Sequence, residues 1–215
     1  MNLSHYGEDG IRILFGDVID LEVHEKVRRF YYLIKSLKRQ DIIDIIPSFR
    51  SCLIHFDLRQ TTYERLSSLI MDAHQQAPSV RPLPEAATHE IPVHYGGEYG
   101  FDMAFVCTHT GLPEDEIIDI HAGVVYTVFA VGFVPGFPYL GTLDPRLHVP
   151  RLETPRTRIP GGSVGIAQGQ TGIYPFPSPA GWRIIGRTDS SLFNPQKEPH
   201  SLLKIGDRVK FIKYD

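Results

Sequence analysis

The sequence predicts an α+β fold, with a small α/β domain followed by a β-rich domain. Apolar residues recur at helical spacing in the first part of the chain, whereas a period of two dominates from Tyr126 onward. Turn residues change in the same way, because residues 1–80 hold three Gly and two Pro while residues 81–215 hold sixteen Gly and fifteen Pro. We therefore place the two domains at residues 1–85 and 86–215.

The connection between the domains is predicted at Ala77 to Glu85. Pro78, Pro82 and Pro84 lie in this segment. Proline cannot continue a helix and restricts the backbone, so we expect a stiff linker.

The first domain alternates strand and helix patterns. Asp20 is a candidate cap for a helix with one apolar stripe, and Thr61 with Glu64 forms a capping box for a second helix. The predicted order is strand Ile11 to Phe15, helix Val23 to Leu37, strands Ile42 to Ile46 and Cys52 to Phe56, helix Thr61 to Ala73, and strand Glu90 to His94. This order favours a ferredoxin-like layer, in which helices cover one face of a mainly antiparallel sheet.

The second domain begins with two short helices and continues as strands between Pro/Gly turns. Pro113 and three acidic residues predict the start of one helix over residues 113–122, because the helix dipole favours acids in the first turn. The strand candidates are Tyr126 to Phe133, Ser163 to Ala167, Ile173 to Tyr174, Trp182 to Gly186 and Arg208 to Tyr214. The pattern indicates a β-barrel or a β-sandwich.

Composition excludes several classes of function. The formal net charge is −3 and no basic block is present, so we expect no nucleic-acid partner. No apolar run approaches the ~20 residues that span a bilayer, and the first residues lack the pattern of a signal peptide. We therefore expect a cytoplasmic protein without a membrane partner. Cys52 and Cys107 lack zinc-site spacing and are interpreted as buried thiols.

The segment from Gly132 to Gly186 holds ten Gly and nine Pro in 55 residues. Within it, residues 133–141 combine fixed and free backbone positions with large aromatic rings, which suits a rigid, exposed lip. We expect Phe137 and Tyr139 of this lip to be partly exposed and to bind a ligand. The alternative is a hairpin whose rings only fill the mouth of the barrel.

This half of the chain contains a series of specific motifs. They are Gly132-Phe133-x-Pro135-Gly136-Phe137-Pro138-Tyr139-Leu140-Gly141, Pro150-Arg151, Pro155-Arg156, Gly162-Ser163-Val164-Gly165-Ile166-Ala167, Gln170-Thr171-Gly172-Ile173-Tyr174-Pro175, Gly181-Trp182, Ile185-Gly186-Arg187-Thr188 and Leu192-Phe193-Asn194-Pro195. These motifs resemble those of the KipI family, which includes allophanate hydrolase subunit 1 and the B subunit of bacterial 5-oxoprolinase.

The resemblance implies an α/β amino-terminal domain and a cyclophilin-like β-barrel. It also implies that the chain acts with a KipA-like protein, which is the C subunit of 5-oxoprolinase, and with a lactam-utilisation protein, which is its A subunit. Together they would open 5-oxoproline to glutamate with ATP, which we expect to be bound mainly by the partners. Two alternatives are inhibition of a sporulation histidine kinase and an allophanate hydrolase or urea carboxyltransferase role.

The candidate site residues lie in or beside these motifs. His121, Arg156 and Arg187 are the catalytic candidates, since guanidinium groups hold carboxylates or phosphates and the His121 to Tyr126 spacing matches the family. The alternative for His121 is a buried histidine with satisfied hydrogen bonds. The substrate-binding candidates are Phe137, Tyr139, Ser163, Gln170, Thr171, Tyr174 and Trp182. No histidine pattern supports a metal site.

The pattern Gly161-Gly162-Ser163-Val164-Gly165, followed in the chain by Asp189 and His200, raises the possibility of a serine hydrolase. A nucleophile elbow needs a strand before the serine and a helix after it. Ser163 is followed by turn and strand residues instead. We therefore interpret Ser163 as a hydrogen-bonding loop residue.

Overall fold

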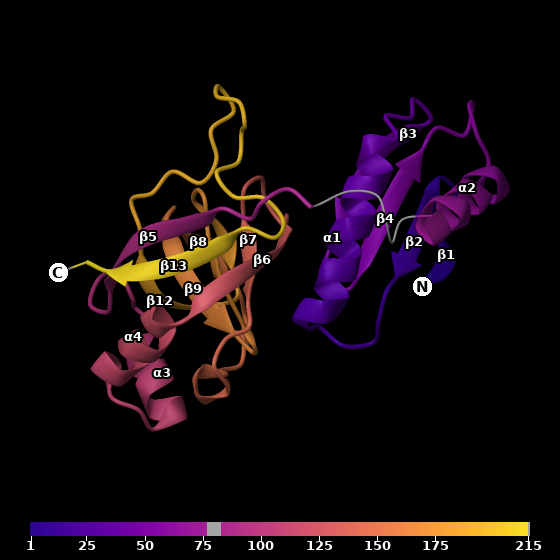
Figure 1. Cartoon of the computed structure of the whole chain (residues 1–215). Coiled ribbons are helices and arrows are strands. Elements are labelled where there is room, and N and C mark those ends of the chain that lie inside the picture. Colours follow the sequence, from indigo (N-terminus) through magenta and orange to yellow (C-terminus); the bar gives the residue numbers. More distant parts are fainter. Residues whose placement is uncertain (77–82, 215) are drawn as a thin grey trace. The chain divides into compact units, whose positions relative to one another are not determined.

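The computed structural model describes residues 1–76 and 83–214 (Figure 1). The chain divides into two compact units, Met1–Glu85 and Ala86–Asp215. Most of the predicted connection, Ala77 to Glu85, lies outside the described residues.

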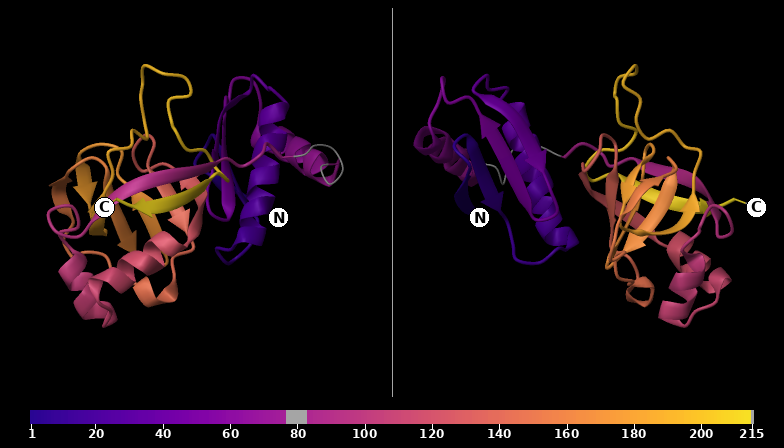
Figure 2. Two further views of the ribbon diagram at one scale, coloured as in Figure 1. Left: turned by 60° about the vertical axis from the view of Figure 1, so that its left-hand side comes forward. Right: turned by 180° about the vertical axis from the view of Figure 1, so that it is seen from behind.

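The first unit is a four-stranded antiparallel sheet in the order β1-β2-β4-β3. Its elements are β1 Asn2–Tyr6, β2 Gly10–Leu14, α1 Leu21–Ser36, β3 Ile42–Pro47, β4 Ser51–Phe56 and α2 Tyr63–Gln76. Figure 2 shows both helices on one face of the sheet, where Phe30, Ile34, Leu66 and Ile70 are buried. Asp20 caps α1 as predicted, because its side chain accepts a hydrogen bond of 2.7 Å from the Val23 N–H.

Three features of the first unit differ from the prediction. Strand β1 was not predicted, since its side chains are mostly exposed and it pairs only with β2. The cap of α2 is Thr62, which accepts from the Arg65 N–H, whereas Thr61 is buried beside Asp41. The predicted strand Glu90 to His94 lies in the barrel of the second unit, and β1 supplies the edge strand of this sheet instead.

The second unit is built on a closed barrel of seven strands in the order β10-β7-β6-β13-β5-β12-β9. These strands are β5 Thr88–Tyr95, β6 Val125–Val131, β7 Pro138–Gly141, β9 Ser163–Ala167, β10 Gln170–Ile173, β12 Arg183–Arg187 and β13 Arg208–Lys213. Only β5 and β13 are parallel, and the other neighbours are antiparallel. The sequence left open whether this unit is a barrel or a sandwich, and the structure shows a closed barrel.

Helices and short elements complete this unit. Helices α3 Met103–Thr110 and α4 Glu114–Gly123 confirm the two predicted helices, and Pro113 stands at the N-cap. Strands β8 Arg156–Ile159 and β11 Ser178–Ala180 form a separate two-stranded sheet, and Pro145–Leu147 is a 3-10 helix, η2. None of these last three was predicted.

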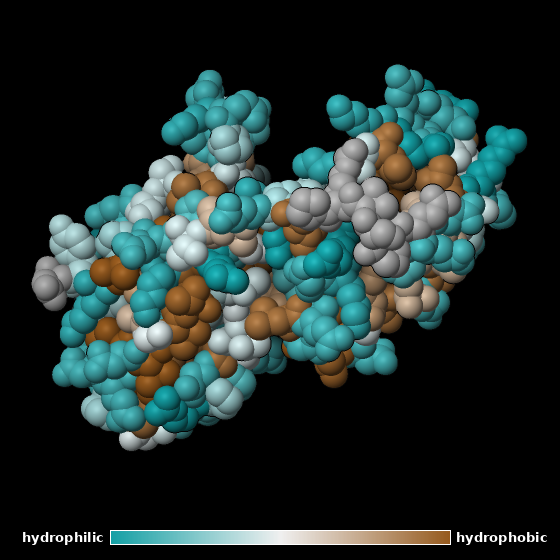
Figure 3. Space-filling view, viewed as in Figure 1, coloured by the Kyte–Doolittle hydropathy of each residue, from teal (hydrophilic) through white to brown (hydrophobic). Residues whose placement is uncertain are grey.

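The surface of the second unit is partly apolar. Figure 3 shows hydrophobic surface over α4 and the start of β6, where Val125 is 51% exposed. No helix in residues 1–76 or 83–214 is long and apolar enough to cross a membrane.

Candidate functional site

The carboxylate of Asp102 joins three segments of the second unit. Arg156 of β8 donates two hydrogen bonds to it, at 2.9 and 2.7 Å, and the Ile184 N–H of β12 donates a third at 2.8 Å. Arg183 lies 3.9 Å from the same carboxylate. Asp102 is 5% exposed, so its charge is buried and compensated by this pairing.

The loop before Asp102 lies against β12 through its backbone. The Gly96 N–H donates to the Ile185 carbonyl, and the Asp102 N–H donates to the Ile184 carbonyl, both at 3.0 Å. A Cβ at Gly100 would clash with the Ile185 carbonyl oxygen, so only glycine allows this approach. The loop is therefore held in one position on the barrel.

This position places three aromatic rings beneath three arginines. Arg187 lies over Tyr99 at 4.5 Å, Arg156 over Phe101 at 4.8 Å and Arg183 over Phe105 at 3.5 Å. Guanidinium groups bind aromatic faces by cation–π attraction, which fixes them while leaving their edge N–H groups available. The two predicted arginines, Arg156 and Arg187, therefore lie over rings of the same loop, because Phe101 and Tyr99 are two residues apart in the chain.

The two predicted arginines differ in what they can still bind. The donors of Arg156 that face Asp102 are already occupied, so the predicted role of holding a substrate carboxylate does not fit it. Within the described residues, Arg187 makes no ion pair and is half-buried on Tyr99. Of these two arginines, Arg187 is the better placed to receive an anionic group.

His121 lies in the core rather than in an open site. Its Nδ1 is 2.8 Å from the Tyr95 hydroxyl, and its Nε2 is 2.9 Å from the Thr171 hydroxyl. Because the Thr171 hydroxyl donates its proton to the Gly165 carbonyl, Nε2–H is the donor to Thr171 and Nδ1 accepts from Tyr95. Both ring nitrogens thus have hydrogen-bond partners, which agrees with the alternative interpretation of His121 as a buried histidine with satisfied hydrogen bonds.

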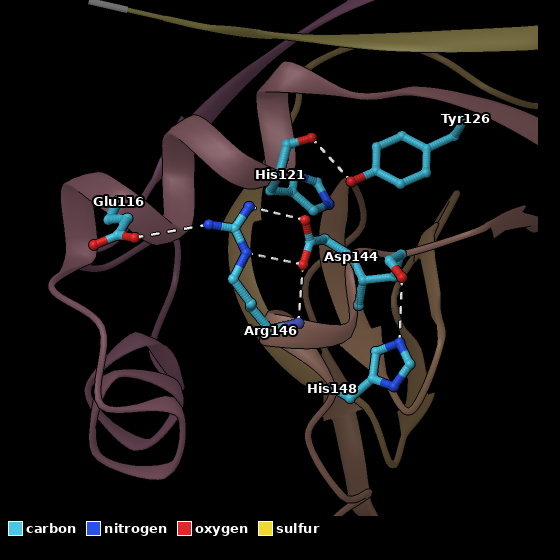
Figure 4. A network of polar contacts seen from close by, with 7 residues as sticks. Glu116, His121, Tyr126, Asp144, Arg146 and His148 are labelled. Atoms are coloured by element: carbon cyan, nitrogen blue, oxygen red, sulfur yellow. Dashed lines mark hydrogen bonds and ion pairs between the residues drawn. The ribbon is translucent and has the colours of Figure 1, made fainter.

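The surroundings of His121 keep it neutral. The ring is fully buried and stacks on Phe211 at 4.6 Å, and burial lowers its pKa from 6.5 to about 3. Figure 4 shows the Tyr126 hydroxyl directed at the His121 backbone carbonyl, to which it donates at 3.0 Å. We therefore assign His121 and Thr171 a structural role, which joins α4 to three barrel strands, and correct the catalytic prediction for His121.

The prediction that Phe137 is exposed is wrong. Phe137 is 2% exposed and packs edge-on against Tyr139, Tyr174 and Trp182, at centroid distances of 4.9 to 5.6 Å. We call these four rings the aromatic cluster. A Cβ at Gly172 would lie 2.9 Å from the Phe137 ring, so the glycines of this region make room for the rings.

The lip nevertheless presents one ring to solvent. Phe133 is 62% exposed, while Tyr139 is half-buried within the aromatic cluster. Phe133 was quoted within a motif but was not selected as a site residue, because composition does not show which side of a turn a ring faces. Tyr174 and Trp182, both predicted to bind substrate, are buried at 2% and 4% exposure.

Ser163 is the first residue of β9 and is 1% exposed. Its hydroxyl donates to the Pro160 carbonyl at 2.8 Å, which agrees with a hydrogen-bonding role although it lies in a strand. Asp189 and His200 are exposed, and the His200 imidazole pairs with Glu198. Gln170 of β10 is half-exposed and remains a candidate for contact with a ligand.

A second polar network lies at η2. Arg146 donates two hydrogen bonds to Asp144 and lies 3.9 Å from Glu116 of α4, as drawn in Figure 4. The bond from Arg146 lowers the pKa of Asp144 to about 2. Arg146 is 58% exposed and its charge is balanced, so this network has the character of a surface ion pair rather than a site. In the described parts of the chain, no group of three or more His, Cys, Asp or Glu could hold a metal ion.

Known protein families place this geometry in context. The family described as "Carboxyltransferase domain, subdomain C and D" matches residues 1–203. The chain belongs to this family. The predicted relation to the B subunit of 5-oxoprolinase is confirmed as well, because a protein of that name from Bacillus subtilis (strain 168) is 37% identical over 98% of this chain and 92% of its own length. Another, from Escherichia coli O157:H7, is 50% identical over 60% of this chain and 59% of its own.

Solved structures confirm the α+β fold class. TTHA0988 has a TM-score of 0.84 and 32% identity over 96% of this chain, which spans only 40% of the TTHA0988 chain. The urea carboxylase of Kluyveromyces lactis has a TM-score of 0.83 over 99% of this chain and 22% of its own. Its 19% identity shows a shared fold and no more.

We predict that stability falls with acidification in the window set by His121. Between pH 6.5 and 3 the unfolded chain binds a proton at this imidazole that the folded chain excludes. The free energy of unfolding should therefore fall by up to about 1.4 kcal/mol per pH unit below 6.5, with no such loss above it. Urea unfolding at pH 7, 5.5 and 4.5 measures this slope.

The comparison for this slope uses His121→Gln and a matched variant of an exposed histidine, His109→Gln. His121→Gln should be less stable at pH 7 but lose stability less steeply toward pH 4.5, whereas His109→Gln should follow the wild-type slope. Equal slopes for all three proteins would show that His121 is not held neutral.

We also predict that Phe137→Ala destabilises the fold. Removing a buried aromatic ring costs ~3–5 kcal/mol. The matched change Phe133→Ala removes an exposed ring and should cost less than about 1 kcal/mol. Denaturant titrations of both variants test this, and a small effect of Phe137→Ala would restore the exposed position expected from the sequence.

Proposed function

We propose that this chain is the B subunit of an ATP-dependent 5-oxoprolinase, which opens 5-oxoproline to glutamate together with a KipA-like protein and a lactam-utilisation protein. The observation that carries the proposal is the 37% identity over 98% of this chain to a protein named as that subunit. The fold supports it as well, because the match to the carboxyltransferase subdomain family extends over residues 1–203.

The substrate offers two groups for recognition, a carboxylate and a lactam carbonyl. Arg187 fits the carboxylate, because its guanidinium lies on Tyr99 at 4.5 Å and carries no ion pair among the described residues. A planar guanidinium donates two parallel hydrogen bonds to a carboxylate. Arg151 also lies over a ring, Trp182, but at 5.9 Å and on an exposed segment, so it is less firmly positioned.

The other residues of this face act by positioning. Asp102 holds Arg156 and the β12 backbone, and this pairing keeps the loop that carries Tyr99 against the barrel. The Tyr99 ring then limits the directions in which the Arg187 edge can point. This chain would therefore orient 5-oxoproline and leave the activation of its carbonyl to the complete assembly.

Two glycines of the Gly162 to Ala167 motif do not fit a phosphate site, since the Gly162 N–H donates to the Tyr174 carbonyl and Gly165 lies within strand β9. A Cβ at Gly162 would clash with the Thr188 carbonyl oxygen, and Gly165 packs against Trp182, Ile184 and Tyr174. Their backbones face protein atoms, whereas a phosphate-binding loop turns free N–H groups toward its ligand. This supports the proposal that ATP is bound mainly by the partners.

We predict that the purified chain alone does not convert 5-oxoproline with ATP. No complete set of nucleophile, base and phosphate-binding groups lies together in the described residues, so hydrolysis should need the partners. Adding the KipA-like protein and the lactam-utilisation protein should restore release of glutamate, measured with ADP formation. Turnover by the lone, verified pure chain would contradict the composite site, and an inactive assembly would contradict the proposed function.

Arg187→Gln should raise the KM for 5-oxoproline in the assembly by about 10- to 100-fold, the cost of one charge-assisted pair. The expected change in kcat is smaller, since the residue orients the substrate. Arg158→Gln provides the control, because Arg158 is exposed and lies over no ring. A KM for Arg187→Gln within twofold of wild type would remove Arg187 from the site.

A further inference from the structure

Arg187 and His94 lie directly opposite each other on two neighbouring strands of the barrel. The strands are β12 and β5, which pair in the antiparallel sense with Arg187 in register with His94. In Figure 1, β5 runs beside β13, which is its neighbour on the other side. Residues paired in this way have Cβ atoms ~4.5–5.5 Å apart on the same face of a sheet. One small ligand can therefore contact both side chains.

The ring of Tyr99 contacts both of these side chains. Arg187 lies over this ring at 4.5 Å, and the His94 imidazole stacks on it with centroids 4.9 Å apart and an angle of 28° between the planes. His94 also contacts the ring of Tyr214, at a centroid distance of 4.3 Å. The imidazole is therefore held between two rings, in a fixed position relative to the guanidinium.

The polar atoms of His94 have no partner within its own chain. In residues 1–76 and 83–214, no hydrogen bond or ion pair joins this imidazole to another group, although the side chain is half-buried. His121 differs, because both of its ring nitrogens are hydrogen-bonded to hydroxyl groups. A neutral imidazole offers one N–H donor and one acceptor nitrogen. An oriented imidazole without a partner has both available for a ligand.

A second arrangement of arginine, ring and histidine lies on α3 and shows by contrast what is special about the first. Arg183 lies over Phe105 at 3.5 Å, and His109 stacks on Phe105 at 5.7 Å. Arg183 is 3.9 Å from the buried carboxylate of Asp102, so its charge is compensated. This second arrangement therefore packs α3 on the barrel without offering an unpaired cation, and it provides a matched control.

We propose that His94 determines the specificity of the Arg187 site, by accepting a hydrogen bond from the ring N–H of a lactam whose carboxylate lies on Arg187. The inference rests on the proposed function, which supplies 5-oxoproline as the substrate. In 5-oxoproline the ring nitrogen is bonded to the carbon that carries the carboxylate, so these two groups are adjacent, as Arg187 and His94 are. A site that hydrogen-bonds a substrate N–H discriminates against an analogue that lacks this donor.

The test compares two ligands in solution NMR titrations of the full-length chain. They are 5-oxoproline and its cyclopentanone analogue, in which a methylene group replaces the ring N–H. The wild-type chain should bind the lactam about 3- to 10-fold more tightly than the analogue, which corresponds to one neutral hydrogen bond.

Two variants of His94 isolate this bond. His94→Phe keeps a ring for stacking on Tyr99 but has no acceptor, so it should bind the two ligands equally and bind the analogue within twofold of wild type. His94→Gln keeps an acceptor and should retain part of the preference for the lactam. The control is His109→Phe, which makes the same change in the second arrangement and should keep the wild-type preference.

Several outcomes would overturn the inference. They are failure of the wild-type chain to bind 5-oxoproline, equal binding of the two ligands by wild type, and a wild-type preference in His94→Phe. Equal weakening of both ligands in His94→Phe would also overturn it, because the change would then act on the fold or on the carboxylate. Loss of the preference in His109→Phe would show that it does not depend on His94 in particular.

Failure of the proposed function is distinguishable from failure of this inference. An assembly that does not convert 5-oxoproline, combined with a lactam preference that only the His94 variants reduce, contradicts the 5-oxoprolinase assignment and supports recognition of the N–H by His94. An active assembly whose His94→Phe chain keeps the wild-type preference leaves the enzyme assignment in place and contradicts the role of His94.

Discussion

The buried carboxylate of Asp102 is the group on which the outer face of the barrel depends. This carboxylate accepts hydrogen bonds from Arg156 and from the Ile184 N–H, while the backbone N–H of Asp102 donates to the Ile184 carbonyl. A carboxylate at 5% exposure is costly unless it is paired, so each of these bonds also holds its donor in place. Through them the start of α3, β8 and β12 form one rigid surface.

The substrate-binding role that we propose for Arg187 follows from a difference between two arginines on that surface. Arg156 donates two hydrogen bonds to Asp102, whereas Arg187 lies on the Tyr99 ring and makes no ion pair among the described residues. An unpaired guanidinium binds a carboxylate through two parallel hydrogen bonds. The buried aromatic cluster packs against the turn between β6 and β7 through Phe133.

Local sequence signals predicted local structure well and long-range contacts poorly. Strand β9 has the predicted bounds, and Asp20 caps α1, because both depend on neighbours within a few residues. The Asp102 to Arg156 pair spans 54 residues and the His121 to Thr171 bond spans 50, and no spacing rule relates such positions. The Pro/Gly density of the lip indicated a rigid turn correctly but could not show that Phe137 faces inward and Phe133 outward.

A structure of the complete assembly with 5-oxoproline bound tests the central claim most directly. The account predicts that the substrate carboxylate accepts hydrogen bonds from Arg187, with the Tyr99 ring behind the guanidinium and Arg156 still paired with Asp102. A substrate bound with its carboxylate on Arg156, or held entirely by the partners away from Tyr99 and Arg187, would contradict it.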